Sequence, residues 1–121
     1  MFVVSGSFHA LVESVDADRL IDACEVVFLA MPHGQAAHLA PKLVSGGVTV
    51  VDLGADFRLR NPAAYARYYG QEHPSPGLLD EAVYGLPELN REALSGARLI
   101  ASPGCYPTAV TLAAHPILDL A

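Results

Sequence analysis

The sequence lacks the features that mark metal-binding, secreted or membrane-spanning proteins. Its two cysteines, Cys24 and Cys105, form no C-x-x-C pair, which excludes a zinc ribbon, a thioredoxin-type motif and a disulfide scaffold. Its five histidines show no metal-ligand spacing. No apolar run approaches the about 20 residues that cross a bilayer, and the first ten residues do not form a secretory signal. We therefore expect a cytoplasmic protein with no metal site and no membrane partner.

Positive charge is also scarce. Seven Lys and Arg residues stand against 13 Asp and Glu residues, giving a net charge of −6, and no basic run occurs. This composition argues against a nucleic-acid partner. Hydrophobic residues make up 52% of the chain and charged residues 17%, which argues against intrinsic disorder. A chain of 121 residues forms one small domain at most.

Strand-like and helix-like segments alternate along the chain, which predicts the α/β class. Apolar runs of β-forming residues are typical of strands that are covered on both faces. Strand, helix and strand joined by short turns predict a parallel, right-handed unit. Pro41 predicts a kink or a late start in its helix. We expect strands over 26–30, 48–51 and 98–101, helices over 16–23, 35–44, 63–69, 90–94 and 106–120, and little regular structure over 71–89.

Cys105 is the most informative residue. It follows a strand and the turn Pro103-Gly104, and it opens a helix. The free N–H groups of a first helical turn stabilise a thiolate or a developing oxyanion, and ligands bind at the carboxyl ends of parallel strands. From the residues alone, a reactive nucleophile and a buried structural cysteine stand about even. Cys24 lies at a helix end that disfavours a thiolate, so we interpret it as structural.

Two further segments follow predicted strands. Arg58 can bind a carboxylate or phosphate with paired donors, and Asp56 can position that arginine or bond to it; the alternative is a surface ion pair. Pro32, His33 and Gly34 lead into a helix N-terminus that suits a dinucleotide or another anion, although His33 can instead simply cap the turn. Neither a G-x-G-x-x-G fingerprint nor a P-loop occurs.

Four segments together carry a family resemblance. They are VVFLAMPHG at 26–34, VDLGADFRL at 51–59, YGLPELN at 84–90 and SPGCYPT at 102–108. In this order they resemble N-acetyl-γ-glutamyl-phosphate reductase of arginine biosynthesis. Gly54 stands where that family more often has serine. The related lysine-pathway reductase, which acts on a carrier-bound substrate, shares these motifs and is a close alternative.

The resemblance implies NADPH-dependent reduction of an acyl phosphate, N-acetyl-γ-glutamyl phosphate, to the semialdehyde. It implies that Cys105 is the nucleophile, forming a thioester that hydride from NADP(H) reduces. Arg58 would bind the substrate. The residues expected to bind the cofactor are Pro32, His33, Gly34, Pro103 and Gly104. The family's acid/base histidine lies further along its sequence, in a second domain.

The resemblance also implies that the chain is an internal portion of a longer enzyme. We expect a partial Rossmann-like parallel sheet with flanking helices, lacking the first βαβ unit and most of the second domain, which resembles that of glyceraldehyde-3-phosphate dehydrogenase. Residues 1–24 match the family poorly, 25–104 would be the remainder of the NADP-binding domain, and 105–121 the helix of the catalytic cysteine.

The intact enzyme is expected to be a homo-oligomer, whereas this portion alone is expected to be inactive and, with an open sheet edge, to self-associate. Two other function classes stay open. One is a binding or interaction fragment that keeps a Rossmann-like fold without catalysis. The other is a cysteine hydrolase in which His33 would serve Cys105.

Overall fold

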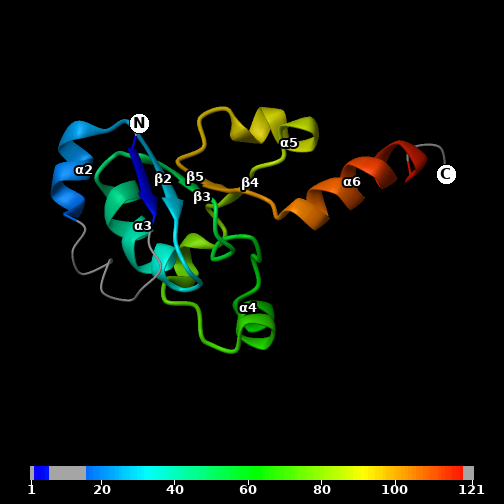
Figure 1. Ribbon diagram of the computed structural model, residues 1–121, viewed down its shortest axis with the longest axis horizontal. Helices are drawn as coiled ribbons and strands as arrows, with labels where there is room; N and C mark the ends of the chain where they lie inside the picture. The colour runs from blue at the N-terminus through cyan, green and yellow to red at the C-terminus, as the bar shows by residue number, and fades with distance from the viewer. Residues whose placement is uncertain (1, 6–15, 119–121) are drawn as a thin grey trace.

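The computed structural model describes residues 2–5 and 16–118, and it confirms the predicted α/β class (Figure 1). One parallel sheet has the strand order β1-β2-β3-β5-β4. Its strands are β1 (Phe2–Ser5), β2 (Val26–Ala30), β3 (Thr49–Asp52), β4 (Val83–Tyr84) and β5 (Leu99–Ala101). The helices are α2 (Ala17–Ala23), α3 (Gln35–Ser45), α4 (Pro62–Tyr69), α5 (Pro87–Leu94) and α6 (Cys105–Leu118), with a short 3-10 helix η1 (Pro76–Leu78).

Two of these strands have no counterpart in the sequence-based expectation. Strand β4 lies in the segment 71–89, for which we expected little regular structure, and it contains only two residues. Val83 and Tyr84 are strand because they pair with Ile100 and Ala101 of β5. Strand β1 pairs with β2 from Phe2 onward. Such short strands show no periodicity of their own, so tertiary pairing decides them.

The core lies between the sheet and the helices α2 and α3, which contact each other. In β2, Val27 and Leu29 are fully buried, whereas the alternating residues Val26, Phe28 and Ala30 are only half-buried. The expectation that this strand is covered on both faces is therefore wrong for one face. From α3, Leu39, Ala40 and Leu43 pack into the same core.

Helix α3 starts at Gln35 and continues through Pro41, so the expected late start is wrong. Proline has no N–H, and the carbonyl of Ala37, four residues earlier, loses its helical donor. The hydroxyl of Ser75 donates to this carbonyl at 2.8 Å. A side chain from a distant loop thus compensates for the missing hydrogen bond.

Helix α5 begins at Pro87, three residues before the position predicted for its cap. Asn90 has non-helical dihedral angles (φ −124°, ψ 23°) and divides the helix at a kink, so the part after it agrees with the short helix predicted up to Leu94. Its side-chain amide donates to the carbonyl of Tyr84 at 3.1 Å. This contact to β4 explains why a residue with capping character lies inside the helix.

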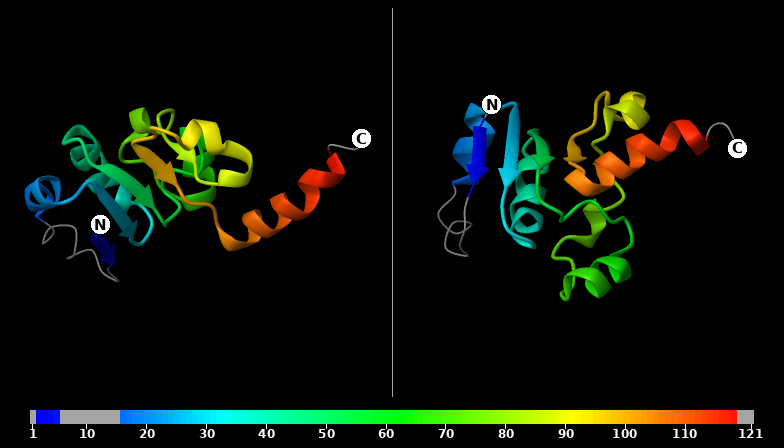
Figure 2. Two further views of the ribbon diagram at one scale, coloured as in Figure 1. Left: turned by 90° about the horizontal axis from the view of Figure 1, so that it is seen from above. Right: turned by 45° about the vertical axis from the view of Figure 1, so that its right-hand side comes forward.

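Helix α6 projects from the body of the molecule, as both views of Figure 2 show. None of its residues is buried, and its described part contains no Lys, Arg, Asp or Glu. Tyr106 is 83% exposed, and Val110 and Ile117 are also exposed. Within residues 2–5 and 16–118, no helix is long and apolar enough to cross a membrane.

Candidate active site

The carboxyl ends of β2, β3 and β5 lie next to one another, because these strands are parallel neighbours. The N–H of Leu53, just after β3, donates to the carbonyl of Leu29 in β2 at 2.9 Å. The N–H of Ser102, just after β5, donates to the carbonyl of Asp52 at the end of β3 at 2.8 Å. The loops that follow the three strands therefore meet at one edge of the sheet, as the sequence predicted.

Cys105 is the first residue of α6 and is exposed. The preceding residue, Gly104, accepts two hydrogen bonds on its carbonyl from Thr108: one from the N–H at 3.0 Å and one from the hydroxyl at 2.8 Å. These bonds close the first turn of the helix. Within the described structure, the thiol thus lies at an accessible helix N-terminus and is not buried.

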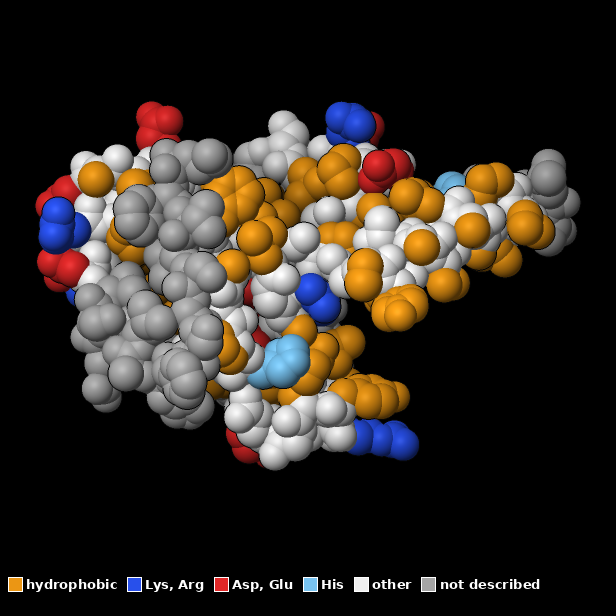
Figure 3. Space-filling view, in the orientation of Figure 1, with side chains coloured by type: hydrophobic (Ala, Val, Ile, Leu, Met, Phe, Trp, Pro, Cys, Tyr) orange, Lys and Arg blue, Asp and Glu red, His pale blue; other side chains and the backbone are white. Residues whose placement is uncertain are grey.

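Arg58 joins the loop after β3 to the loop after β5. Its Nε donates to the carbonyl of Ser102 at 2.8 Å, and its Nη2 donates to the carbonyl of Leu53 at 3.2 Å. The third nitrogen, Nη1, lies so close to Gly104 that a Cβ there would be 3.2 Å away. Figure 3 shows a hollow in the surface between α4 and α6, with basic and histidine side chains at its margin.

Asp56 does not serve Arg58, and the expectation that it would is wrong. Its side chain is 1% exposed and caps α3. Oδ1 accepts hydrogen bonds from the N–H of Gly34 at 2.8 Å and from the hydroxyl of Tyr65 at 3.2 Å, and Oδ2 accepts from the N–H of Ala37 at 3.0 Å. The carboxylate therefore occupies the place that an external anion would take at this helix N-terminus.

The three predicted cofactor-binding residues after β2 differ in their accessibility. Gly34 is buried and adopts φ +83°, and its N–H is bound to Asp56. Pro32 and His33 are exposed. The His33 ring packs against Tyr69 with a centroid distance of 4.9 Å. Only Pro32 and His33 of this loop are thus open to a ligand.

Asp52, the last residue of β3, is a buried carboxyl that we did not predict from the sequence. Its Oδ1 accepts from the N–H of Gly54 at 2.9 Å, and its Oδ2 accepts from the N–H of Asp56 at 3.2 Å. Burial raises the pKa of Asp52 from 3.8 to about 6, with a further increase from the charge of Asp56, while the bond from Gly54 opposes this shift. The available signal was a carboxylate that ends an apolar strand.

His73 is buried beside the same network. Its Nδ1 accepts from the N–H of Ser75 at 3.0 Å, so its Nε2 carries the proton and donates to the carbonyl of Asp56 at 2.9 Å. Burial lowers the pKa of His73, and its ring packs edge-on against Tyr65 at 4.7 Å. Both ring nitrogens are engaged, so His73 is structural. The described part of the chain contains no group of three or more side chains that could hold a metal ion.

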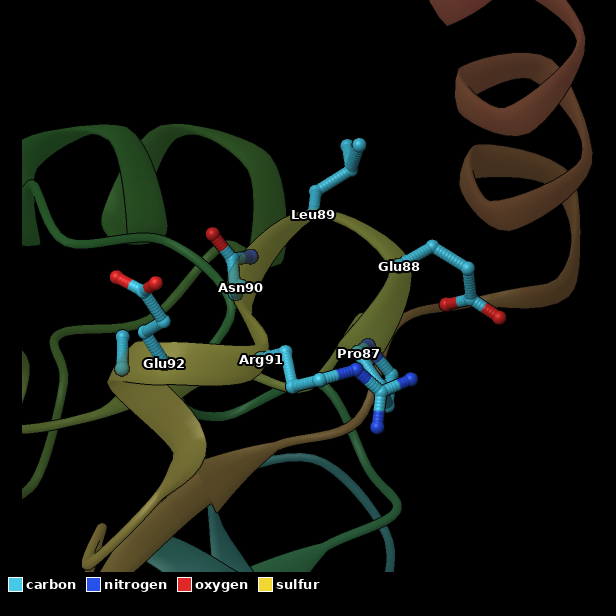
Figure 4. A pocket seen from close by; sticks show the side chains of 7 residues that line it. Pro87, Glu88, Leu89, Asn90, Arg91 and Glu92 are labelled. Atoms are coloured by element: carbon cyan, nitrogen blue, oxygen red, sulfur yellow. The ribbon is translucent and has the colours of Figure 1, made fainter.

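A second hollow, of about 570 Å³, lies along α5 (Figure 4). It is open to solvent, and most of the side chains around it are exposed. Its lining consists of Pro87, Glu88, Leu89, Asn90, Arg91, Glu92 and Ala93. It contains none of the predicted site residues, so the candidate active site is the edge that carries Cys105 and Arg58.

Comparison with known proteins identifies the family to which this chain belongs. The sequence model of the protein family described as "Semialdehyde dehydrogenase, NAD binding domain" matches residues 4–97. An N-acetyl-γ-glutamyl-phosphate reductase of Halorhodospira halophila is 53% identical over 116 residues, which is 96% of this chain and 33% of that protein. The protein of the same name from Pseudomonas aeruginosa PAO1 is 54% identical over 114 residues, covering 94% and 33%. The chain thus spans about a third of the length of these curated relatives.

Among solved structures, the chain is similar to aspartate semialdehyde dehydrogenase II of Vibrio cholerae, a crystal structure of its complex with ASA. The TM-score is 0.55 with 22% identity, covering 89% of this chain and 29% of that one, and this likeness concerns the fold alone. The names of the closely similar relatives confirm the resemblance that the four segments carry. The match over residues 4–97 shows that the chain belongs to the semialdehyde dehydrogenase family, in its NAD-binding domain.

Proposed function

We propose that this chain forms the part of an N-acetyl-γ-glutamyl-phosphate reductase that bears the nucleophile and contacts NADP(H). The observation that carries this proposal is the exposed Cys105 at the N-terminus of α6, on the edge where β2, β3 and β5 end. The high identity to reductases of that name supports the choice of reaction.

In the proposed reaction, the Cys105 thiolate attacks the carbonyl carbon of the acyl phosphate. The bond from this carbon to the phosphate oxygen breaks, phosphate leaves with the electron pair, and a thioester forms. Free N–H groups in the first turn of α6 can donate to the carbonyl oxygen as negative charge develops on it. Covalent catalysis of this kind divides one difficult displacement into two easier steps.

Bound NADPH would supply the hydride that reduces the thioester carbonyl. The resulting thiohemiacetal on Cys105 collapses to the semialdehyde and frees the thiolate. We assign Arg58 to the substrate, because its Nη1 lies next to Gly104, beside the nucleophile's turn. A guanidinium there suits the charge of the departing phosphate.

The residues present fit the nicotinamide end of the cofactor better than its central pyrophosphate. Pro32 and His33 after β2 are exposed, and Pro103 and Gly104 after β5 are half-exposed, with the end of β3 between the two loops. The N–H of Gly34, however, is bound to Asp56. We therefore infer that these loops hold the nicotinamide end, and that the pyrophosphate is bound elsewhere.

We further propose that the 121 residues alone bind NADPH weakly and do not turn over substrate. Both ring nitrogens of His73 are engaged in structural hydrogen bonds, and His115 lies in the last turn of α6, far along the helix from Cys105. Neither histidine is placed to act as acid or base at the thiol. Titration calorimetry with NADPH tests the binding, and micromolar affinity would contradict the proposal.

The intact enzyme is proposed to be a cytoplasmic homo-oligomer with no nucleic-acid or membrane partner. The net charge of −6 and the absence of a basic run support the lack of a nucleic-acid partner. Size-exclusion chromatography with light scattering on the intact enzyme measures the oligomeric state, and a monomer would contradict this proposal.

A chimera tests the proposed reaction with this chain's own residues. The matching third of the Pseudomonas aeruginosa relative would be replaced by this chain, and reduction of NADP⁺ measured with N-acetylglutamate semialdehyde and phosphate. Turnover should vanish in Cys105→Ser. It should persist in Cys24→Ala, which changes the other cysteine, half-buried against the core. A folded Cys105→Ser chimera that retains turnover would sink the nucleophile assignment.

The same chimera distinguishes the remaining alternatives. Turnover only with a carrier-bound substrate would favour the lysine-pathway reductase. Thioester hydrolysis without cofactor would favour a cysteine hydrolase. For the latter, His33 would have to leave its contact with Tyr69 to serve Cys105.

A further inference from the structure

We propose that Arg58 is a positioning residue, whose guanidinium holds the 102–104 turn and thereby sets Cys105 at the N-terminus of α6. This role is separate from binding substrate, and it exists in the free protein. The consequence of this role for catalysis rests on the proposed function, but the experiment that tests the role does not.

The turn is held from two sides at Ser102. The N–H of Ser102 donates to the carbonyl of Asp52, and the carbonyl of Ser102 accepts from Nε of Arg58, both at 2.8 Å. Because one bond comes from the backbone of β3 and the other from a side chain of the next loop, the peptide groups on both sides of this residue are fixed. Pro103 then restricts the backbone further.

Arg58 is itself held in place. Its Nη2 donates to the carbonyl of Leu53, so the guanidinium bridges two loop carbonyls through two different nitrogens. A Cβ on Gly104 would lie 3.2 Å from Nη1 and 3.8 Å from Cζ, so the turn packs closely on the guanidinium. Lysine keeps the charge but has a single nitrogen, which cannot reproduce this forked geometry.

Downstream of the turn, nothing else in the described structure buries the start of α6. Cys105, Tyr106 and Pro107 are all exposed. Among the described residues, the carbonyl of Gly104 accepts its hydrogen bonds from Thr108 of the same helix. The contacts to the body that orient the thiol therefore pass through the turn, and Arg58 provides the side-chain part of them.

The reactivity of the thiol toward a neutral reagent tests this role without substrate or cofactor. In a Cys24→Ala background, alkylation of Cys105 by iodoacetamide would be followed by mass spectrometry across neutral and alkaline pH. We expect Arg58→Lys and Arg58→Gln each to slow the reaction at neutral pH on the order of fivefold, the effect of about one net hydrogen bond. Both pH–rate profiles should move toward higher pH.

Arg60→Gln is the matched control, because Arg60 lies in the same loop, is exposed, and loses the same charge. Its rate and profile should equal those of the parent. Two results would overturn the proposal: unchanged reactivity in both Arg58 variants, or a loss confined to Arg58→Gln, which would mean that charge alone acts.

Hydrogen exchange separates local loosening from unfolding. Protection of the Ser102 and Thr108 amides should fall, while that of Val50, bonded to the carbonyl of Arg98 within the sheet, should not. If the Arg58 variants unfold, Gly104→Ala provides the second test, since it keeps Arg58 and crowds its Nη1. It should slow alkylation similarly, and an unchanged rate would overturn the proposal. Turnover of the chimera fails or succeeds independently of these outcomes.

Discussion

Helices α3 and α6 begin at the same edge of the sheet, but different groups lie at their N-termini. Each follows a parallel strand and a short turn that ends in glycine, Gly34 or Gly104. At α3, the buried carboxylate of Asp56 binds the N–H groups of Gly34 and Ala37. At α6, the first residue is the exposed Cys105. A helix N-terminus after a strand is thus a ligand site only where the protein does not fill it with its own anion.

A single loop supplies the groups that create this difference. Asp56 and Arg58 are two residues apart after β3, but they face opposite neighbours: the carboxylate reaches the β2 side and the guanidinium reaches the β5 side. The loop after β3 thus caps α3 with a carboxylate and binds the turn before α6 with a guanidinium. The predictions below test the two halves of this arrangement, from the largest expected effect to the smallest.

Removing the carboxylate that caps the N-terminus of α3 should have the largest effect on stability. Asp56→Ala leaves the N–H groups of Gly34 and Ala37 and the hydroxyl of Tyr65 without their acceptor. We expect the free energy of unfolding to fall by about 3–5 kcal/mol, since each buried donor left unpaired costs about 1–3 kcal/mol. Urea denaturation followed by circular dichroism measures the loss. Asp56→Asn, which keeps one acceptor oxygen, should cost less, and equal losses would argue against capping as the cause.

The buried carboxyl of Asp52, at the end of β3, should make stability depend on pH. The pKa of Asp52 is about 6 when folded and 3.8 as the reference, so the folded protein holds the proton more tightly. The contribution is therefore fully present below about pH 4 and is lost as the pH rises through about 6. The expected loss is roughly 3 kcal/mol, at about 1.4 kcal/mol per pKa unit.

Comparison with Asp52→Asn isolates this dependence. His73 acts in the opposite direction, because its lowered pKa removes stability as the pH falls below its ordinary range. The variant keeps His73, so the difference in unfolding free energy between the parent and Asp52→Asn should retain only the Asp52 contribution. A difference that stays constant between pH 4 and pH 7 would rule out a raised pKa at Asp52.

A smaller effect is expected on the interior of α3. Ser75→Ala removes the donor to the carbonyl of Ala37 and should lower the free energy of unfolding by about 1–2 kcal/mol. Pro41→Ala restores an N–H to that carbonyl, so the same Ser75 substitution should cost less than about 0.5 kcal/mol in that background. Thermal or urea unfolding of the four proteins completes the cycle. Additive effects would mean that Ser75 does not compensate for Pro41.

The smallest effect is expected at the N-terminus of α6. Thr108→Val keeps the side-chain shape but removes the hydroxyl that donates to the carbonyl of Gly104. Because α6 has no buried residue, we expect faster hydrogen exchange at the first turn, by about two- to fivefold, with no change in global unfolding. NMR-detected exchange measures this. A global loss as large as that of Asp56→Ala would contradict the contrast between the two termini.

Much of this arrangement could be predicted from local patterns. The β2–α3–β3 unit followed from apolar runs and turn residues, and α4 begins where Asn61-Pro62 predicted, with the Asn61 side chain accepting from the N–H of Ala63 at 2.8 Å. Cys105 at the start of a helix also followed from the sequence around it. These features depend on residues that are neighbours along the chain.

What failed depends on residues far apart in the sequence. The partner of Asp56 was expected to be Arg58, two positions away, but its carboxylate binds amides 19 and 22 positions away. Pro41 was expected to disturb α3, but Ser75 compensates from another loop. Strand β4 exists only through its pairing with β5.

The sequence by itself determined the α/β class, the parallel unit at its centre and the residue types that collect at one edge of the sheet. Those features follow from hydrophobic periodicity and from the conformational preferences of single residues. Only the tertiary structure decided which of two similar helix N-termini is closed and which is open. That choice depends on where charged side chains find their hydrogen-bond partners. The buried carboxylate of Asp56 and the half-buried guanidinium of Arg58 bind the groups that the fold brings within about 3 Å of them, whatever the distance along the chain.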